Sequence, residues 1–308
     1  MVVYEFTGKT FRIKAGSPPL NLLGVTENVM RIKCWGSRGS ISVSGKDFVE
    51  YGGDTTCIEI QADSGEVIII DAGTGIRRLG ISLMQRQVKA FHLLLTHCHW
   101  DHILGIAFFR PLLKKGNRLI CQDRDFAGLS TQKVFYEVMK DPFFPVRMED
   151  FQADIVYDNS LKGSFSIGDV AVETIPTSHS EGSVGYKFTE NGKTFVFLTD
   201  NELGFAHAQS RTRDEYIDFC RGADILFHDA EYTADEYPHK TGWGHSSVPD
   251  VLDLAMKAGV GELGLIHINQ DRTDAQMDDI VADCCKFLKN KQSAIKCYAV
   301  PFNFDTSL

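Results

Sequence analysis

The chain has 308 residues, of which 43% are hydrophobic and 24% are charged, an ordinary composition for a compact folded protein. Its net charge of −9 argues against broad binding to a phosphate backbone, which usually needs a basic face. No stretch approaches the roughly 18 apolar residues of a membrane helix, and no N-terminal signal is visible. Eight scattered cysteines without a disulfide framework indicate a reducing, cytoplasmic environment.

The chain divides into a short first segment and a long patterned region. Residues 1–29, interrupted by Ser17-Pro18-Pro19, are expected to form a peripheral extension without catalytic residues. Residues 30–308 should form one folded domain. Its first half predicts a helix at about Ile76–Gln85, another after His102, and strands at Met30–Trp35, Cys57–Gln61, Val67–Ile70, Phe91–Leu95 and Arg118–Cys121.

The second half begins after residues 122–165, which carry no clear pattern. Within them, prolines bracket Phe143-Phe144, an aromatic loop that would either lie over a site or anchor a long connection. Strands are predicted at Val170–Ile175, Tyr186–Thr189, Thr194–Leu198, Ile225–Phe227, Leu263–Ile268 and Ile295–Val300, with a hairpin turn at Asn191-Gly192 and helices at Arg213–Cys220, Val248–Ala258 and after Thr273. Strands followed by helices in two halves fit packed sheets flanked by helices.

The segment Thr96-His97-Cys98-His99-Trp100-Asp101-His102 carries the strongest chemical signal. It follows an apolar run that predicts a buried strand. Imidazole and carboxylate are ligands for zinc and similar metals. His97 and His99 are two residues apart at the expected strand end, so they should project the same way. Asp101 and His102 should approach from another side, an arrangement that can serve two adjacent metals. We expect Cys98 to pack rather than bind metal.

Further candidate ligands follow other predicted strands. His179, Asp200 and His267 each come at or near the end of a hydrophobic run. With these residues, the HxHxDH segment resembles the metallo-β-lactamase superfamily. The resemblance implies a four-layer αββα sandwich holding two divalent ions, zinc first and manganese second. It places His97, His99 and His179 on one metal, Asp101, His102 and His267 on the other, and Asp200 between them.

Glycine-rich turns in the first half add a second layer of resemblance. Gly36–Ser40, Tyr51–Cys57 and Ile70–Gly75 are similar to the branch that contains ribonuclease Z and cyclic phosphate phosphodiesterases. Asp71, within the last of these, would hold the outer nitrogen of a metal-bound histidine and raise its basicity. Simple turn chemistry is an equal explanation for the glycines.

A motif downstream of the ligands separates the chemical subclasses. Gly244-His245-Ser246-Ser247 and the preceding Asp229 resemble a motif pair that ribonuclease Z-like enzymes place beside the metals. The resemblance makes His245 the proton donor to the leaving oxygen and Asp229 its orienter, and with Asp101 they form the expected catalytic set. A helix-capping loop is the alternative. His239 and Lys240 are weaker candidates for binding an anionic substrate, and His228 is expected to be structural.

These features predict a dinuclear metal-dependent phosphodiesterase that hydrolyses a small cyclic phosphate or nucleotide by attack of a metal-bound hydroxide. The acidic chain and the lack of an evident basic Gly/Pro-rich arm favour a small substrate over tRNA. The alternatives are a carbonyl ester hydrolase such as a lactonase or thioesterase, an RNA-processing endonuclease, and a non-catalytic metal-containing sensor. A homodimer is compatible with the resemblance, and no membrane partner is expected.

Overall fold

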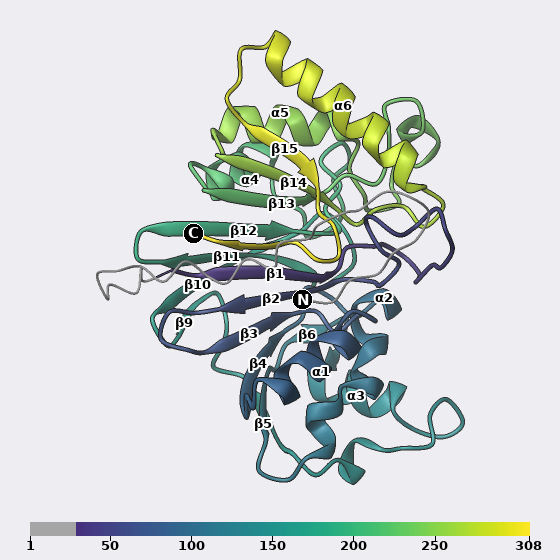
Figure 1. Ribbon diagram of the computed structural model, residues 1–308, viewed down its shortest axis with the longest axis vertical. Helices are drawn as coiled ribbons and strands as arrows, with labels where there is room; N and C mark the ends of the chain where they lie inside the picture. Colours follow the sequence, from purple (N-terminus) through teal and green to yellow (C-terminus); the bar gives the residue numbers. More distant parts are fainter. Residues whose placement is uncertain (1–28) are drawn as a thin grey trace, which may run out of the picture.

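The computed structural model describes residues 29–308, so all but the last residue of the expected extension lies outside the described chain. Two seven-stranded sheets pack face to face, and helices cover the outer face of each sheet (Figure 1). The order of layers is helix, sheet, sheet, helix. The expected αββα sandwich is confirmed.

The first sheet contains the strands of the first half and the C-terminal strand. In spatial order it consists of β16 (Asp305–Ser307), β1 (Arg31–Gly36), β2 (Cys57–Gln61), β3 (Val67–Ile70), β4 (Ala90–Leu94), β5 (Arg118–Gln122) and β8 (Asp154–Asp158). From β3 to β8 neighbouring strands are parallel. Their carboxyl ends therefore lie at one edge of the sheet.

The second sheet also contains a run of parallel strands. It consists of β15 (Lys296–Ala299), β14 (Glu262–Ile266), β13 (Ile225–Asp229), β12 (Lys193–Leu198), β11 (Val184–Glu190), β10 (Val170–Pro176) and β9 (Ser164–Ile167). Strands β12 to β15 are parallel, and β11 is antiparallel to both β10 and β12. Strands β10, β12, β13 and β14 therefore end at a common edge.

Helices complete the outer layers. On the first sheet lie α1 (Ile76–Gln85), α2 (Trp100–Ile103) and α3 (Thr131–Val138), with the 3₁₀ turns η1 (Leu104–Phe108), η2 (Arg110–Leu113) and η3 (Met148–Asp150) and the small hairpin β6 (Asp125–Phe126) and β7 (Leu129–Ser130). On the second lie α4 (Arg213–Cys220), α5 (Val248–Ala258) and α6 (Asp274–Asn290), with η4 (Tyr237–His239) nearby. Ser247 caps α5, which ends at the left-handed Gly259 as its sequence predicts.

Three apolar cores hold the layers together. The central core lies between the sheets, where isoleucines such as Ile58 and Ile68 pack with phenylalanines such as Phe195 and Phe227. The two outer cores pack α1 and α3 on the first sheet, and α4 to α6 on the second. Each fully buried aliphatic or aromatic side chain contributes roughly 1.5–3 kcal/mol. The rigid sandwich fixes the strand ends that carry the site.

The structure corrects several element boundaries near the site. Helix α2 begins at Trp100 rather than after His102, so two candidate ligands lie inside it. Strand β4 ends at Leu94, so His97 and His99 lie in the following loop and not at a strand end. Strand β14 ends at Ile266, because His267 adopts a left-handed backbone with φ of 57°.

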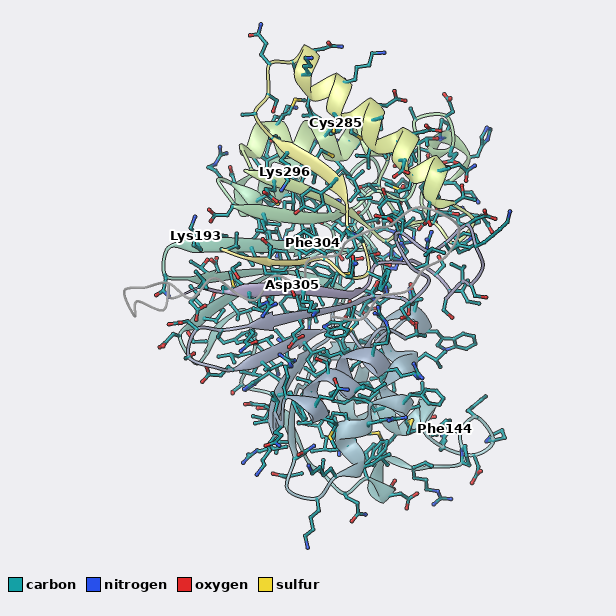
Figure 2. The ribbon with its side chains drawn as sticks, viewed as in Figure 1. Phe144, Lys193, Cys285, Lys296, Phe304 and Asp305 are labelled. Atoms are coloured by element: carbon teal, nitrogen blue, oxygen red, sulfur yellow. The ribbon has the colours of Figure 1, made fainter. Side chains whose placement is uncertain are left out.

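The aromatic loop in residues 122–165 serves as an anchor. Phe144 packs against the outer core of the first sheet, and its ring centroid lies 5.7 Å from that of Phe108. Figure 2 shows Phe144 among the helices on that sheet. Phe143 is exposed. Neither phenylalanine lines the cleft described below, so the anchoring alternative fits the structure.

Candidate dinuclear metal centre

The candidate ligands gather where the parallel strands of both sheets end. His97, His99, Asp101 and His102 follow β4, and His179 follows β10. Asp200 follows β12 and His267 follows β14. Asp71, Asp200 and His267 all have left-handed backbones, with φ between 49° and 62°. Such conformations are uncommon outside glycine and concentrate at functional sites, which makes these strand ends a site by geometry as well as by residue type.

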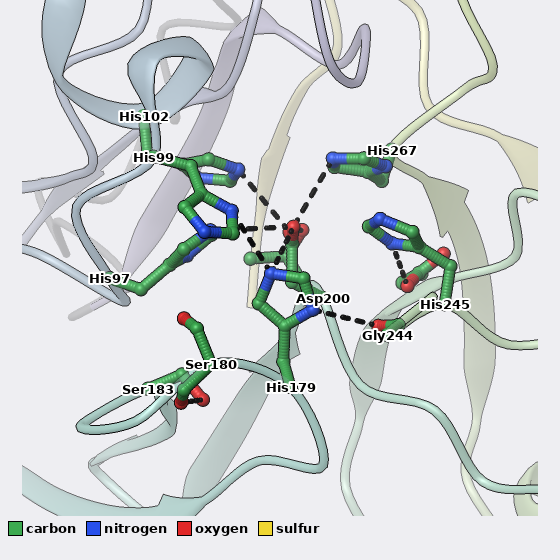
Figure 3. A network of polar contacts seen from close by, with 12 residues as sticks. His97, His99, His102, His179, Ser180, Ser183, Asp200, Gly244, His245 and His267 are labelled. Carbon is green, nitrogen blue, oxygen red and sulfur yellow. Dashed lines mark hydrogen bonds and ion pairs between the residues drawn. The ribbon is translucent and has the colours of Figure 1, made fainter. Parts of the chain in front are cut away.

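The first ligand group consists of His97, His99, His179 and Asp200. One donor atom from each residue lies within 4.8 Å of the others. Nε2 of His179 lies 3.1 Å from Nδ1 of His99, and Oδ2 of Asp200 lies 3.5 Å from Nε2 of His97 and 3.6 Å from Nε2 of His179. Figure 3 shows the three imidazoles converging on the Asp200 carboxylate.

The second ligand group consists of Asp101, His102 and His267. Oδ2 of Asp101 lies 3.2 Å from Nε2 of both histidines. Asp200 faces this group too, with oxygens 3.3 Å from Nε2 of His102 and 3.4 Å from Nε2 of His267. Asp200 therefore lies between the two groups, in the place that the resemblance assigns to a bridging ligand. All seven expected ligands are brought together.

The buried atoms of these groups fit metal ions. Nε2 of His97 and Nε2 of His102 are buried, and within residues 29–308 neither makes a hydrogen bond of good geometry, although each faces the carboxylates named above. A buried polar atom without a partner is costly, and a divalent cation would satisfy both lone pairs. Burial lowers the pKa of His97 well below its ordinary value and that of His179 to about 3, so both imidazoles are neutral and ready to donate.

The charge of the carboxylates also suits a cation. Burial acts to raise the pKa of Asp200, but His267 and His102 outweigh it and hold this pKa well below its ordinary value. The carboxylates in turn raise the pKa of His102 and His267, against the effect of burial. The group thus attracts positive charge strongly, and a bound metal ion would take the place of these protons.

Two further carboxylates hold the outer nitrogens of the second group. Nδ1 of His102 lies 2.8 Å from Oδ2 of Asp71, which also accepts the Thr96 hydroxyl. Asp71 therefore holds the outer nitrogen of a candidate ligand histidine, as its position in the sequence predicts. Nδ1 of His267 lies 2.9 Å from Oε2 of Glu231. The sequence reasoning missed Glu231, although it lies two residues after Asp229, the last residue of β13. Such partners fix the tautomer that presents Nε2 to a metal.

A glycine loop holds His179. Nδ1 of His179 lies 3.2 Å from the carbonyl oxygen of Gly244 (Figure 3). Gly244 has φ of 93°, and a Cβ atom there would overlap the His179 ring. The buried Glu202 accepts hydrogen bonds from the backbone of Gly242 and Gly244 and from the Tyr237 hydroxyl, and so shapes the loop. Glu202 was also missed; its only signal is a carboxylate closely following Asp200.

His245 and Asp229 form the expected pair. Nδ1 of His245 lies 2.9 Å from Oδ2 of Asp229, and the His245 ring stacks on His267 with centroids 4.5 Å apart. Burial acts to lower the pKa of His245, but the Asp229 carboxylate outweighs it and raises this pKa. A nitrogen of His245 also lies within 4.8 Å of donor atoms of Asp200 and His267. His245 is therefore placed either to donate a proton or to bind metal.

The remaining candidates belong to neither ligand group. Cys98 packs against the outer core, as expected, and is in none of the ligand groups. His228 is fully buried beside Asn201, which fits a structural role. His239 and Lys240 do not line the cleft, and Lys240 instead lies over the Trp243 ring at 3.9 Å.

The glycine turns of the first half pack directly against the site. A Cβ atom on Gly39 would overlap His267, and one on Gly73 would overlap the backbone of Asp101. The backbone N–H of Ser40 donates to Oδ2 of Asp101 at 2.8 Å. These glycines therefore permit close approach of the chain to the ligands, beyond simple turn formation.

A cleft of about 420 Å³ opens over both ligand groups, within the size range of small-molecule sites. Its walls are Ser40, Cys98, His99, Trp100, Asp101, Asp200, His245 and His267. The donor sets and this open cleft can present two metal ions to a substrate. All eight cysteines are free, and no helix within residues 29–308 combines the length and apolarity needed to cross a membrane.

The chain is similar to several known proteins. Ribonuclease Z from Haloarcula marismortui is 24% identical over 300 residues, which cover 82% of this chain and 90% of that protein. The metallo-beta-lactamase fold protein YhfI from Bacillus subtilis has a TM-score of 0.66 at 17% identity, covering 92% of this chain and all of that one. A diphosphatase from the PhnP family has a TM-score of 0.62 at 21% identity, and the match covers 91% of this chain and 98% of that one.

The fold, the His/Asp cluster and these relatives define a metal-dependent hydrolase. The family model described as the beta-lactamase superfamily domain matches residues 66–268, about two thirds of the chain. The protein therefore belongs to the metallo-β-lactamase superfamily, as the HxHxDH segment predicts. This conclusion removes the non-catalytic sensor alternative.

Proposed function

We propose that the protein is a dinuclear phosphodiesterase that hydrolyses a small cyclic phosphate or nucleotide. The observation that carries this proposal is the His245–Asp229 pair, joined at 2.9 Å and stacked against a ligand histidine. An alkoxide leaving group needs a positioned proton donor, and this pair provides one beside the metal centre.

The metals are proposed to be zinc first and manganese second, because the donors are imidazole and carboxylate. When bound, two such ions activate a water at neutral pH and polarise a phosphoryl oxygen. The first group (His97, His99, His179) and the second group (Asp101, His102, His267) would each hold one ion, with Asp200 shared.

Other residues of the chain orient the histidines and supply the proton. Asp71 and Glu231 hold Nδ1 of His102 and His267, so that Nε2 of each ring points to the centre. Asp229 holds Nδ1 of His245, which leaves the other ring nitrogen for the substrate. The attacking water releases a proton to solvent as its oxygen bonds to phosphorus, and the ester P–O bond breaks. His245 gives its proton to the departing oxygen and regains one from solvent.

The lining of the cleft favours a small substrate over RNA. None of the described residues that line it is lysine or arginine. RNA backbones are held mainly by such cations, and the net charge of the chain is −9. RNA processing is the second candidate, because curated relatives from several organisms are named ribonuclease Z.

A panel of substrates tests the proposal. The zinc-loaded protein is offered cyclic nucleotides, ribose cyclic phosphates, a short precursor tRNA, a lactone and a thioester. We expect the highest kcat/KM for a small cyclic phosphate. Preferred cleavage of the tRNA precursor would support the second candidate. Preferred turnover of the lactone or thioester would support the carbonyl ester alternative and overturn the phosphodiesterase proposal. The homodimer, the cytoplasmic location and the domain boundary at residue 30 stay predictions.

A further inference from the structure

One residue of the cleft lining, Trp100, has no function in metal binding. The other seven of the eight lining residues are candidate ligands, the proposed acid His245, or the small side chains Ser40 and Cys98. The eighth is Trp100, whose side chain is large and 74% exposed. Among the described residues that line the cleft, it contributes the one extended apolar face and none is lysine or arginine. Contacts to a substrate beyond its reacting phosphate therefore fall largely to this indole.

Trp100 differs from the other two tryptophans in having no side-chain partner within residues 29–308. Trp35 is buried and its indole N–H donates to Glu59 at 2.9 Å. Trp243 is covered by Lys240 at 3.9 Å. Among residues 29–308, no hydrogen bond, cation or aromatic ring meets the Trp100 indole. An exposed, unpartnered indole at the edge of a cleft presents a free π face and a free N–H group.

The backbone of Trp100 is held firmly relative to the metal centre. Its neighbours His99 and Asp101 belong to different ligand groups. The first turn of α2 is closed by a hydrogen bond from His102 N to His99 O at 3.0 Å, and His102 O accepts from Ala72 N at 2.7 Å. A side chain on such a fixed segment can bind a ligand with little loss of backbone freedom.

We propose that Trp100 is a stacking platform for the base of a nucleotide substrate, an inference that rests on the phosphodiesterase function proposed above. Aromatic side chains stack on any base, because every base has a π face. The absence of lysine and arginine from the part of the cleft lined by residues 29–308 disfavours a second phosphate group. The substrate class is therefore a nucleoside cyclic phosphate or a simple nucleotide ester, in preference to a base-free sugar phosphate.

A binding experiment tests the inference without turnover. Tryptophan fluorescence of the zinc-loaded full chain is followed as AMP or ribose 5-phosphate is added. We expect AMP to quench emission in the wild type and in Trp243→Phe, a matched control outside the cleft, and not in Trp100→Phe. Ribose 5-phosphate should have no effect. Quenching that persists in Trp100→Phe would overturn the inference. So would a Trp100 signal that responds only to protein concentration, since it would assign the indole to a contact between copies of the chain.

Kinetics provide the second readout. Trp100→Ala should raise KM for adenosine 2′,3′-cyclic phosphate about tenfold, within the range of one lost base stack, and leave kcat and metal content nearly unchanged. KM for ribose 2,3-cyclic phosphate should not change, and Trp100→Phe should restore most of the affinity. An equal loss on both substrates would overturn the inference. AMP quenching through Trp100 without cleavage of any phosphodiester would support the platform and reject the proposed function.

Discussion

Oε2 of Glu231 lies 2.9 Å from Nδ1 of His267, so a carboxylate outside the two candidate ligand groups orients a histidine of one of them. Burial acts to raise the pKa of Glu231, but its hydrogen bond with His267 outweighs burial and lowers this pKa, so the partner is an anion. Glu231→Gln would keep the size of the side chain and remove this charge. We expect the affinity of the second metal site to fall about 10–100-fold, which is typical when a residue that hydrogen-bonds to a metal ligand is replaced.

Metal content after dialysis against a calibrated zinc buffer measures this effect. Glu236→Gln is the matched control, because the Glu236 carboxylate pairs with Arg272 away from the ligands. Equal zinc content in both variants would show that Glu231 does not support the metal.

His245 should be needed for turnover and not for metal binding. His245→Ala removes the proposed proton donor, and we expect kcat to fall by roughly 10²-fold or more on an alkyl phosphodiester. The loss should be much smaller with a p-nitrophenyl leaving group, which departs without a proton. Loss of one zinc ion from this variant would instead make His245 a ligand, a role that its position near Asp200 and His267 allows.

Gly244 should be essential because of its contact with His179. In Gly244→Ala, the new Cβ atom would overlap the imidazole, and the backbone at φ of 93° would be strained. We expect at least a tenfold loss of zinc affinity, measured by competition with a chromogenic chelator. Gly222→Ala is the control, since its φ is 65° and no atom lies within 4 Å of the new Cβ. If both variants bind zinc like the wild type, the loop does not position His179.

Removal of metal should lower the stability of the fold. Without ions, the buried Nε2 atoms of His97 and His102 make no hydrogen bond within residues 29–308. An ion at about 100 times its dissociation constant adds about 2.7 kcal/mol per site to the free energy of unfolding. Chelation should therefore reduce Tm by several degrees, with recovery on adding zinc. An unchanged Tm would mean that no ion is bound to the folded state.

The convergence of the candidate ligands could be predicted from the sequence because each follows an apolar strand, and parallel strands bring their ends to one edge. The positions at which individual strands end are predicted less accurately. His267 lies outside β14 and His97 outside β4, since tight left-handed or irregular turns carry no apolar pattern. The ligands converge nonetheless, because the two packed sheets fix where the loops begin.

The elements that the sequence does not reveal lie mainly in residues 122–165. Strand β8 is a half-buried edge strand whose apolar run is only three residues long, and α3 has only eight residues. Glu231 and Glu202 were missed for another reason. Acidic residues near a strand end are common, and only the folded chain shows that these two meet His267 and the Gly244 loop.

A zinc titration tests the central claim most directly. Metal-free protein is titrated with zinc while hydrolysis of bis-p-nitrophenyl phosphate is followed, with bound zinc measured in parallel. Two ligand groups sharing Asp200 predict that activity rises to a plateau at two ions per chain. A plateau at one ion, or no phosphodiester hydrolysis with two ions bound, would contradict the dinuclear phosphodiesterase.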